Sequence, residues 1–453
     1  MGKLLWEILE RAMTGPVMKE DEFETEFFPK KIKEIIAEHG IKYDPENPIM
    51  TDPSMADEIF QAGIELLTEV GLYCKDTKRI VKFDEGEIKE VIKTRKTEVT
   101  LGIGRDRFTI SPRGPEDKKP PKTFYMAGWM GSDLKVWKDA ALMSALEPTA
   151  DGLVPSILEG IYDLRPTTGT PTESLLVQTE ARIMREVAAR AGRPGMWLGI
   201  PMNASHPIAL MSAFGPGLYN RYNCMMPVHI LQDMRINFDR LNLAYFAMQH
   251  GIIPWISSCP TMYAYIGGPE EAAVEGIAHT LGMMAFSDGS FTQAMSMTIQ
   301  SRYDGRECFW ANSAMALAAE RHLKVPWISS GLGAWPVASE NMMYGAACAC
   351  IVACVSGMEG MWMVGGLSAL DQRFAGEFTR AVAGMKVSEG LALIKEILKK
   401  YEDKVPATPE MTLPDFYELY DKKTLKPNSK YLELYKRITR EFKDMGFDYP
   451  TWE

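Results

Sequence analysis

The chain has 453 residues, of which 46% are hydrophobic and 24% are charged, a balance typical of a soluble globular protein with a large core. A formal net charge of −10, without a Lys/Arg cluster to reverse it locally, argues against a surface that binds nucleic acid or an anionic membrane. No run approaches the roughly 18 apolar residues of a membrane span, and the charged first turns do not form a signal peptide, so we expect a cytoplasmic protein.

Sulfur-containing residues are plentiful in this chain. The seven cysteines are an odd number and most lie in apolar surroundings, so we expect reduced thiols. Thirty methionines is a high count. Methionine most often fills irregular gaps in a core, and it also lines pockets that accept flat apolar ligands.

Residues 1–121 are predicted to form an extension ahead of the main domain. Helical periodicity broken by Pro-rich turns dominates its first part, most clearly at 55–70, and a further helix is expected at 84–94. Apolar positions alternate on both sides of Gly-Arg-Asp at 98–111, which predicts a β-hairpin. The polar, Pro-rich stretch 112–121 is a linker into the next domain.

Residues 122–385 are predicted to form a (β/α)8 TIM barrel, an α/β fold. Short apolar strand candidates alternate there with helical stretches, and eight is the number of strands that closes such a barrel. The predicted strands are 124–127, 152–155, 196–201, 227–232, 252–257, 291–298, 326–331 and 359–365. Several end in small or polar residues, which suits a face where loops and a ligand need room. Residues 386–453 form a charged, helical C-terminal extension, packed on the barrel or in a contact between subunits, so we expect a homo-oligomer.

The stretch that organises the barrel is residues 191–203, Ala-Gly-Arg-Pro-Gly-Met-Trp-Leu-Gly-Ile-Pro-Met-Asn. The apolar run after Gly-Arg-Pro-Gly stops at Pro201, which is typical of a buried parallel strand that ends at the catalytic face of a barrel. Its first six residues resemble the segment of monomethylamine-type methylamine:corrinoid methyltransferases that leads into their pyrrolysine. In an alignment without gaps the pyrrolysine column falls on Gly199, so the chain resembles a family member that lacks this residue.

Four further segments are similar to the same family. Residues 71–83 resemble its N-terminal segment, 101–106 its hairpin, 267–271 its loop before a barrel helix, and 376–384 its late helix. Because these segments keep the family's order over most of the chain, the resemblance implies the family's fold. It also implies that the methyl acceptor is the Co(I) corrinoid of a separate corrinoid protein, with no cofactor bound covalently to this chain.

The resemblance also indicates how the site differs from the family's. In the family, pyrrolysine holds the methylamine among acidic and amide side chains. Here the family's active-site glutamate aligns with Ser257 and its glutamine with Gly333, while Asp233 lies opposite a family glutamate and stays acidic. At three positions a large or polar side chain of the family is replaced by a small one. We therefore expect a site that no longer binds an amine and that has a larger volume.

Aromatic and methionine side chains near the predicted strand ends suggest what fills that volume. Planar ligands stack on aromatic rings, so such a cavity favours a methoxylated aromatic compound, as in the methyltransferase components of aromatic O-demethylases, which the chain also resembles. Barrel core and an aromatic cage for a quaternary ammonium are the alternatives. The residues concerned are Trp197, Met202, Trp255, Tyr263, Tyr265, Met297 and Trp335.

Cleavage of an aryl methyl ether leaves a phenolate, which a proton or a Lewis acid would help to leave. Asp233 is the first candidate acid, because a carboxyl group in a partly apolar pocket can stay protonated. Tyr263 and Tyr265 are candidates for hydrogen bonds to the phenolic oxygen. His229 precedes Asp233 by an even offset, so both are expected on one face of a strand. The structural alternatives are a capping aspartate and a core histidine.

A zinc ion is the alternative to a protein acid for activating the leaving group. Its candidate ligands have unpersuasive spacing, since no Cys-x-x-Cys pair is present and only Cys350 and Cys354 align on one helix face. Cys259, at a strand end, is the best placed of them. The candidate ligands are Cys259, Cys308, Cys348, Cys350, Cys354 and His279.

The sequence therefore predicts an enzyme that moves a methyl group from a methoxylated aromatic compound to a cognate corrinoid protein. A second hypothesis is a pyrrolysine-independent methyltransferase for a methylamine or betaine. A third is a barrel without catalysis that only binds a ligand or scaffolds the corrinoid protein.

Overall fold

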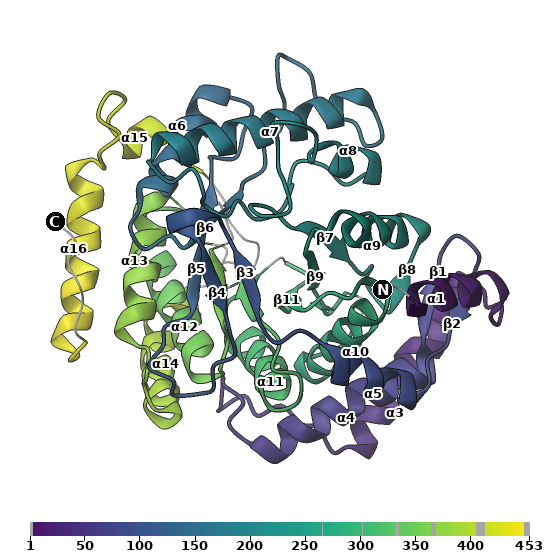
Figure 1. Ribbon diagram of the computed structural model, residues 1–453. Coiled ribbons are helices and arrows are strands. Elements are labelled where there is room, and N and C mark those ends of the chain that lie inside the picture. The colour runs from purple at the N-terminus through teal and green to yellow at the C-terminus, as the bar shows by residue number, and fades with distance from the viewer. Residues whose placement is uncertain are drawn as a thin grey trace.

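The computed structural model describes residues 3–264, 266–300, 302–330, 335–363, 368–404 and 413–447. Its centre is a curled sheet of seven parallel strands surrounded by helices, which is the α/β barrel that the sequence predicts (Figure 1). In spatial order the strands are β6 (Gly152–Pro155), β5 (Lys122–Ala127), β14 (Gly360–Met363), β13 (Trp327–Ser330), β11 (Phe291–Ala294), β9 (Pro254–Ser258) and β7 (Met226–His229).

A short segment around Trp197 joins the two edges of this sheet. The Leu153 N–H donates to the Trp197 carbonyl at 2.9 Å on the β6 side. On the β7 side, the Leu198 N–H donates to the Asn223 carbonyl at 2.7 Å, and the Met225 N–H donates to the Gly199 carbonyl at 2.8 Å. This segment takes the third of eight strand positions, so every predicted strand lies at its expected place. It is shorter than predicted, because Gly199 leaves the extended conformation with φ +70°.

The outer layer consists of helices that follow the strands (Figure 1). They are α6 (Leu134–Leu146), α7 (Pro171–Arg190), α8 (Pro207–Ser212), α9 (Phe238–His250), α10 (Pro269–Ser287), α11 (Arg306–His322), α12 (Glu340–Val355) and α13 (Ala369–Ala381). Residues 272–287 of α10 are buried throughout, because the N-terminal extension covers the side that would otherwise face solvent. Among the described residues no helix is both long and apolar enough to cross a bilayer.

Aromatic rings fill the barrel interior. Trp255 lies 5.0 Å from Phe291, 5.7 Å from Trp197 and 5.8 Å from Trp362, measured between ring centroids. Phe124 meets Trp197 edge to face at 4.7 Å. Trp197 and Trp255 are fully buried. These rings pack mainly on each other and form the core layer of the barrel, as the structural alternative for them predicts.

A β-hairpin closes the amino-terminal end of the barrel. Its antiparallel strands β3 (Val99–Leu101) and β4 (Phe108–Ile110) confirm the predicted hairpin. The Ile103 N–H donates to the carbonyl of Gly195, which precedes the third strand position, at 2.8 Å. Val99, Leu101 and Ile110 pack in the same cluster as the interior rings. With one end plugged, a ligand can reach the interior only from the carboxyl ends of the strands.

The N-terminal extension packs against α10 and α11 (Figure 1). The expected helices at 55–70 and 84–94 are present as α4 and α5, and Asp84 and Glu87 form a capping box at the start of α5. β1 adds a parallel pairing to β8 (Arg235–Ile236), which follows β7. The elements are α1 (Lys3–Thr14), α2 (Glu20–Glu22), η1 (Phe23–Phe27), α3 (Phe28–Glu38), α4 (Pro53–Val70), β1 (Leu72–Cys74), β2 (Arg79–Val81) and α5 (Glu85–Thr94).

The C-terminal extension is helical, as predicted, and packs on the barrel side that carries α12 and α13 (Figure 1). Phe442 contacts Phe378 of α13 at 4.7 Å and Tyr344 of α12 at 6.4 Å between ring centroids. Its elements are α14 (Val387–Tyr401), η3 (Glu402–Lys404), α15 (Phe416–Leu419) and α16 (Ser429–Asp444).

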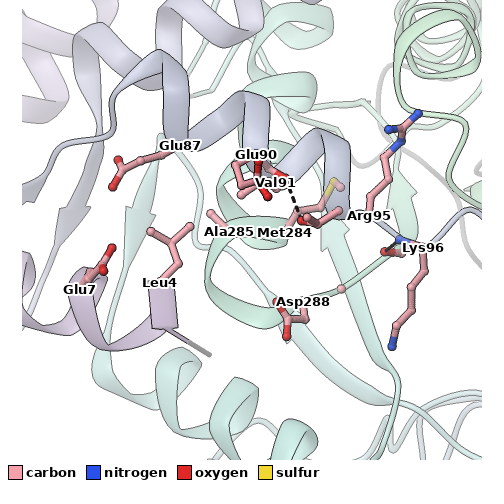
Figure 2. A pocket seen from close by; sticks show the side chains of 13 residues that line it. Leu4, Glu7, Glu87, Glu90, Val91, Arg95, Lys96, Met284, Ala285 and Asp288 are labelled. Atoms are coloured by element: carbon pink, nitrogen blue, oxygen red, sulfur yellow. Dashed lines mark hydrogen bonds between the residues drawn. The ribbon is translucent and has the colours of Figure 1, made fainter. Parts of the chain in front are cut away.

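A cavity of about 600 Å³ lies between α1, α5 and the end of α10 (Figure 2). Asp288 and Ser290 in its wall precede β11, so the cavity opens near the amino-terminal ends of the strands. Its polar lining mixes acidic Glu7 and Glu90 with basic Arg95 and Lys96. The position of this cavity separates it from the carboxyl ends, where barrel enzymes hold their substrates.

A buried arginine, Arg113, attaches the linker to the barrel. The Arg113 guanidinium donates to the carbonyls of Ala353, Cys354 and Met358, at the end of α12, at 3.1 to 3.2 Å. It also donates to the carbonyls of Asp117 and Lys119 in its own linker. Arg113 is 3% exposed, so these carbonyls depend on it in place of water.

We expect Arg113→Met to lower the free energy of unfolding by about 3 to 5 kcal/mol, because it leaves several buried carbonyls without a donor. Urea denaturation of the full chain measures this change. Arg107→Met, at an exposed position nearby, is the matched control and should change it by less than about 0.5 kcal/mol. Equal stability of the two variants would contradict the role of Arg113.

Candidate active site

Three polar side chains form a layer above the interior rings, at the carboxyl ends of β7, β9 and β11. His229 and Gln293 each pair in register with Ser257, so all three point into the barrel. The Ser257 hydroxyl donates to Gln293 Oε1 at 3.3 Å, and the indole N–H of Trp255 donates to the same oxygen at 3.0 Å. This layer is polar and carries no carboxylate.

His229 is electrically neutral in this layer. Burial, with a smaller effect of the Arg240 charge, lowers the pKa of His229 to about 3. Its Nε2 atom is buried and has no hydrogen-bond partner among the described residues. This nitrogen is free to accept a hydrogen bond from a water molecule or a ligand at the carboxyl end of the barrel.

Asp233 lies in a tight turn beyond β7. The strand ends at His229, and Asp233 and Met234 are both left-handed, with φ of 56° and 54°. The predicted sharing of one strand face by His229 and Asp233 is therefore wrong, because no extended backbone joins them. Two side chains of α10 hold the turn: Glu275 Oε1 accepts the Asp233 N–H, and His279 Nε2 accepts the Met234 N–H, both at 3.1 Å.

His279 also holds the end of β9. Its Nδ1 lies 2.8 Å from the Ser258 hydroxyl. Its Nε2 lies 3.1 Å from the Met234 nitrogen and 3.1 Å from Glu275 Oε1. Both ring nitrogens of this zinc-ligand candidate are thus engaged by the protein.

The Asp233 carboxyl group is almost fully buried, since the residue is 3% exposed. Burial and the nearby Glu275 raise the pKa of Asp233 to about 8. Arg235, 3.1 Å from Oδ2, opposes this rise, but the same guanidinium also pairs with Glu24 and lies 3.6 Å from Glu20. Asp233 Oδ1 has no hydrogen-bond partner in the described part of the chain.

A second buried carboxyl group holds the neighbouring loops. Glu180 Oε2, on α7, accepts the N–H groups of Met202 and Asn203 at 3.1 and 2.9 Å and the Asn203 side-chain amide at 2.8 Å. Asn203 in turn accepts the Leu158 N–H at 2.6 Å, in the loop after β6. Sequence reasoning missed Glu180 and Glu275. The available signal was an acidic residue on the apolar face of a predicted helix.

The remaining predicted site residues are dispersed. Met202 is half-buried and packs against the interior cluster, and Met297 is half-buried on β12 (Met297–Thr298), which pairs with β10 (Thr261–Met262). Tyr263 is exposed, and its hydroxyl donates to Glu307 at 2.5 Å. Trp335 packs outside the interior cluster and donates to Asp304 at 2.6 Å. Tyr265 and Gly333 lie outside the described residues.

The cysteine thiols make structural contacts within the fold. Cys350 and Cys354 share a helix face, as predicted, and donate to the carbonyls of Ala375 and Thr379 on α13. Burial, with the Glu275 charge, raises the pKa of Cys259 to about 12. Within the described ranges no three His, Cys, Asp or Glu side chains converge as a metal site would require.

The protein-family model for the monomethylamine methyltransferase MtmB matches residues 4–447 of this chain. The chain belongs to the MtmB family. MtmB of Methanosarcina mazei is 27% identical over 457 residues, with 97% of each chain covered. The crystal structure of Methanosarcina barkeri MtmB superposes with a TM-score of 0.92, 25% identity and 98% coverage of each chain. A structure of the hydroxylamine complex of MtmB superposes equally well.

Within the MtmB fold, Gly199 has a structural role that the sequence did not reveal. A Cβ atom at Gly199 would lie 2.9 Å from the Leu153 carbonyl oxygen and 3.0 Å from Val154 Cα. The residue therefore faces the backbone of β6, and the expected gain of open volume at Gly199 is not seen. Its positive φ instead lets the backbone carbonyl reach β7 and close the barrel.

We expect Gly199→Ala to destabilise the protein by at least about 2 kcal/mol, because it adds both a strained φ and a clash with β6. Gly104→Ala is the matched control, since Gly104 has φ +61° and no atom within 4 Å of the added Cβ. Thermal unfolding of both variants separates the clash from the backbone strain. Equal losses of stability would mean that β6 accommodates the methyl group.

Proposed function

We propose that this chain transfers a methyl group from a neutral methoxylated aromatic compound to a separate corrinoid protein. One observation carries the proposal: a buried carboxyl group, Asp233, whose pKa burial and Glu275 raise to about 8, lies in the turn that follows His229 of the polar layer. An ammonium substrate would be attracted by an ionised carboxylate, whereas a neutral ether needs only a proton donor for its leaving oxygen.

In the proposed reaction the methyl–oxygen bond breaks and its electron pair stays on the oxygen. The partner's corrinoid, as Co(I), supplies the electron pair for the new bond to the methyl carbon. Asp233 gives its proton to the departing aryl oxide. A phenol has a pKa near ~10 and Asp233 a pKa of about 8, so this transfer is downhill. The barrel's share is to orient the ether and to keep water out.

The aromatic ring of the donor needs a binding surface other than Trp197 and Trp255, which pack inside the barrel. Methionines at the strand ends can supply it. Met126 follows Phe124 on the inward face of β5, and Met295 follows Gln293, whose amide lies 3.5 Å from its sulfur. With Met202 they provide thioether contacts, which are favourable at ring edges.

Monomethylamine is a second candidate donor. It is supported by the names of the relatives, which are monomethylamine methyltransferases 27% identical over 97% of this chain. With an amine donor, Asp233 would give its proton to the amine nitrogen, which then leaves as ammonia.

Methyl transfer to a Co(I) corrinoid protein should be followed by the cobalt absorption change, with 2-methoxyphenol, monomethylamine and glycine betaine in parallel. The proposal expects methylation with the ether alone. Methylation with an amine alone would contradict it and establish the second candidate. Binding of the ether without any transfer would indicate a barrel that only binds its ligand.

We expect Asp233→Asn to lower kcat by at least about a hundredfold with little change in substrate affinity, since the amide has no proton to give. In the wild type, kcat should fall as the pH rises through about 8, because Asp233 then loses its proton. Asp239→Asn, at an exposed position, is the control. Equal turnover and an unchanged pH profile in Asp233→Asn would remove Asp233 from the acid role.

A further inference from the structure

A cavity of about 810 Å³ lies on the outside of the barrel, between α6, α13 and the C-terminal helix α16. Figure 1 shows α16 at the edge of the molecule, outside α13. The turn between α15 and α16 completes the wall. This cavity, named here the outer cavity, has no residue of the barrel strands in its described lining. Its volume falls in the range of about 300 to 1,000 Å³ that small-molecule sites occupy.

The floor of the outer cavity is apolar. Met143 of α6 and Leu370 of α13 are buried there, and Leu432 of α16 is half-buried. Leu146, the last residue of α6, is 57% exposed, so an apolar edge of the floor remains uncovered. An apolar floor bounded by three helices can accept the hydrocarbon part of a ligand.

The turn that carries Leu425 into the wall is fixed by Asp421. Asp421 Oδ1 accepts the N–H groups of Lys423 and Thr424, at 3.0 and 2.7 Å. The Asp421 carbonyl accepts the Leu425 N–H at 2.8 Å. Leu425 is left-handed, with φ of 55°, a conformation that is unfavourable for a residue with a Cβ atom. Because these contacts maintain it, the turn presents Leu425 and the next residue, Lys426, to the cavity in one conformation.

Four basic side chains surround the apolar floor without a partner in the protein. Within the described ranges none of them makes an ion pair or a side-chain hydrogen bond. Lys436, Arg440 and Lys443 follow one stripe of α16, and Lys426 lies in the turn. By contrast, Arg437 of the same helix pairs with a glutamate of α12. The four are dispersed in the sequence, and the fold gathers them into a local site for an anion on a chain of net charge −10.

One acidic side chain, Glu147, lines the same cavity. Burial raises the pKa of Glu147 to about 7, although the Arg373 charge opposes the rise. Arg373 Nε lies 3.9 Å from Glu147 Oε2 and donates to Glu377 Oε1 at 3.0 Å. Glu147 is therefore partly protonated near neutral pH and cancels less than one of the positive charges. Its buried Oε2 atom has no hydrogen-bond partner among the described residues, so it can accept a hydrogen bond from a water molecule or a ligand.

We propose that the outer cavity binds a soluble phosphate ester with a hydrocarbon part. The hydrocarbon covers the apolar floor, and the basic side chains around the floor hold the phosphate. A phosphate matches this arrangement because its two negative charges and several oxygens accept charge-assisted hydrogen bonds from more than one cation. An anionic bilayer is not the occupant, because the net charge of −10 repels such a surface. The inference does not depend on the proposed function, since no residue of the carboxyl-end site lines this cavity.

Isothermal titration of the full chain with octyl phosphate, inorganic phosphate and octyl glucoside tests the proposal. Octyl phosphate carries both parts of the proposed ligand, whereas each of the other two compounds lacks one part. We expect octyl phosphate to bind at least about tenfold more tightly than either of them, because the two parts contact different walls of one cavity. Equal affinity for octyl phosphate and for either of the other compounds would overturn the proposal.

A pair of double variants separates the cavity from the overall charge. Lys426→Gln/Lys443→Gln removes two cations of the outer cavity, so we expect the Kd for octyl phosphate to rise at least about tenfold. Lys430→Gln/Arg437→Gln removes the same number of charges from α16 at positions outside the cavity and should bind like the wild type. Equal losses of affinity in the two double variants would overturn the proposal.

A third variant tests the apolar floor. Leu146→Glu places a carboxylate at the exposed edge of the floor, so it should unfold at the wild-type temperature and lose at least about tenfold in affinity for octyl phosphate. Unchanged affinity would overturn the proposal. A changed oligomeric state in Lys426→Gln/Lys443→Gln would overturn it in favour of a second copy of the chain, and retention of the wild type on phosphatidic acid vesicles in favour of a membrane. Methyl transfer should be unchanged in all three variants, so this proposal and the proposed function can fail separately.

Discussion

The mouth of the barrel depends on two carboxyl groups buried in the outer helices. Glu180 of α7 and Glu275 of α10 accept backbone N–H groups from loops that would otherwise have no partner for them. A hydrogen bond to such an acceptor contributes about 1.5 to 3 kcal/mol, which matches or exceeds the roughly 1 to 2 kcal/mol that each left-handed residue costs. The strained turn at Asp233 persists because Glu275 and His279 of α10 accept its backbone N–H groups.

The same contacts set the electrostatics of the site. Glu275 places Asp233 in a buried position and, as a neighbouring carboxyl group, raises its pKa. Arg235, which pairs with Asp233, also pairs with Glu24 of the N-terminal extension, and β1 of the extension pairs with β8, which carries Arg235. The extension therefore contacts the cation that lies against the candidate acid.

The barrel could be predicted from the sequence because parallel strands buried on both faces leave short apolar runs with regular spacing. The site was harder to predict. Trp197 and Trp255 lie close in sequence to the strand ends, yet their rings point into the layer below, where they form core. The period-2 alternation of a strand predicts whether a side chain points into or out of the barrel. It does not predict how far along the barrel axis that side chain lies.

Two further features of the site depend on tertiary contacts and could not be predicted from the sequence. The turn at Asp233 interrupts a run that looked extended, because Glu275 and His279, over forty residues away, satisfy its backbone. Gly199 looked like a lost side chain, whereas the close approach of β6 requires glycine there. In both cases the residues that determine the backbone conformation are distant in sequence, so a local sequence pattern cannot predict it.

The proposed acid role requires Asp233 to be neutral at physiological pH. Infrared difference spectra between the wild type and Asp233→Asn measure this protonation through the C=O stretching band of a protonated carboxyl group. We expect a band at neutral pH that is missing in the variant and that disappears from the wild type as the pH rises through about 8. No difference between the two proteins at neutral pH would mean that Asp233 is ionised and would remove it from the acid role.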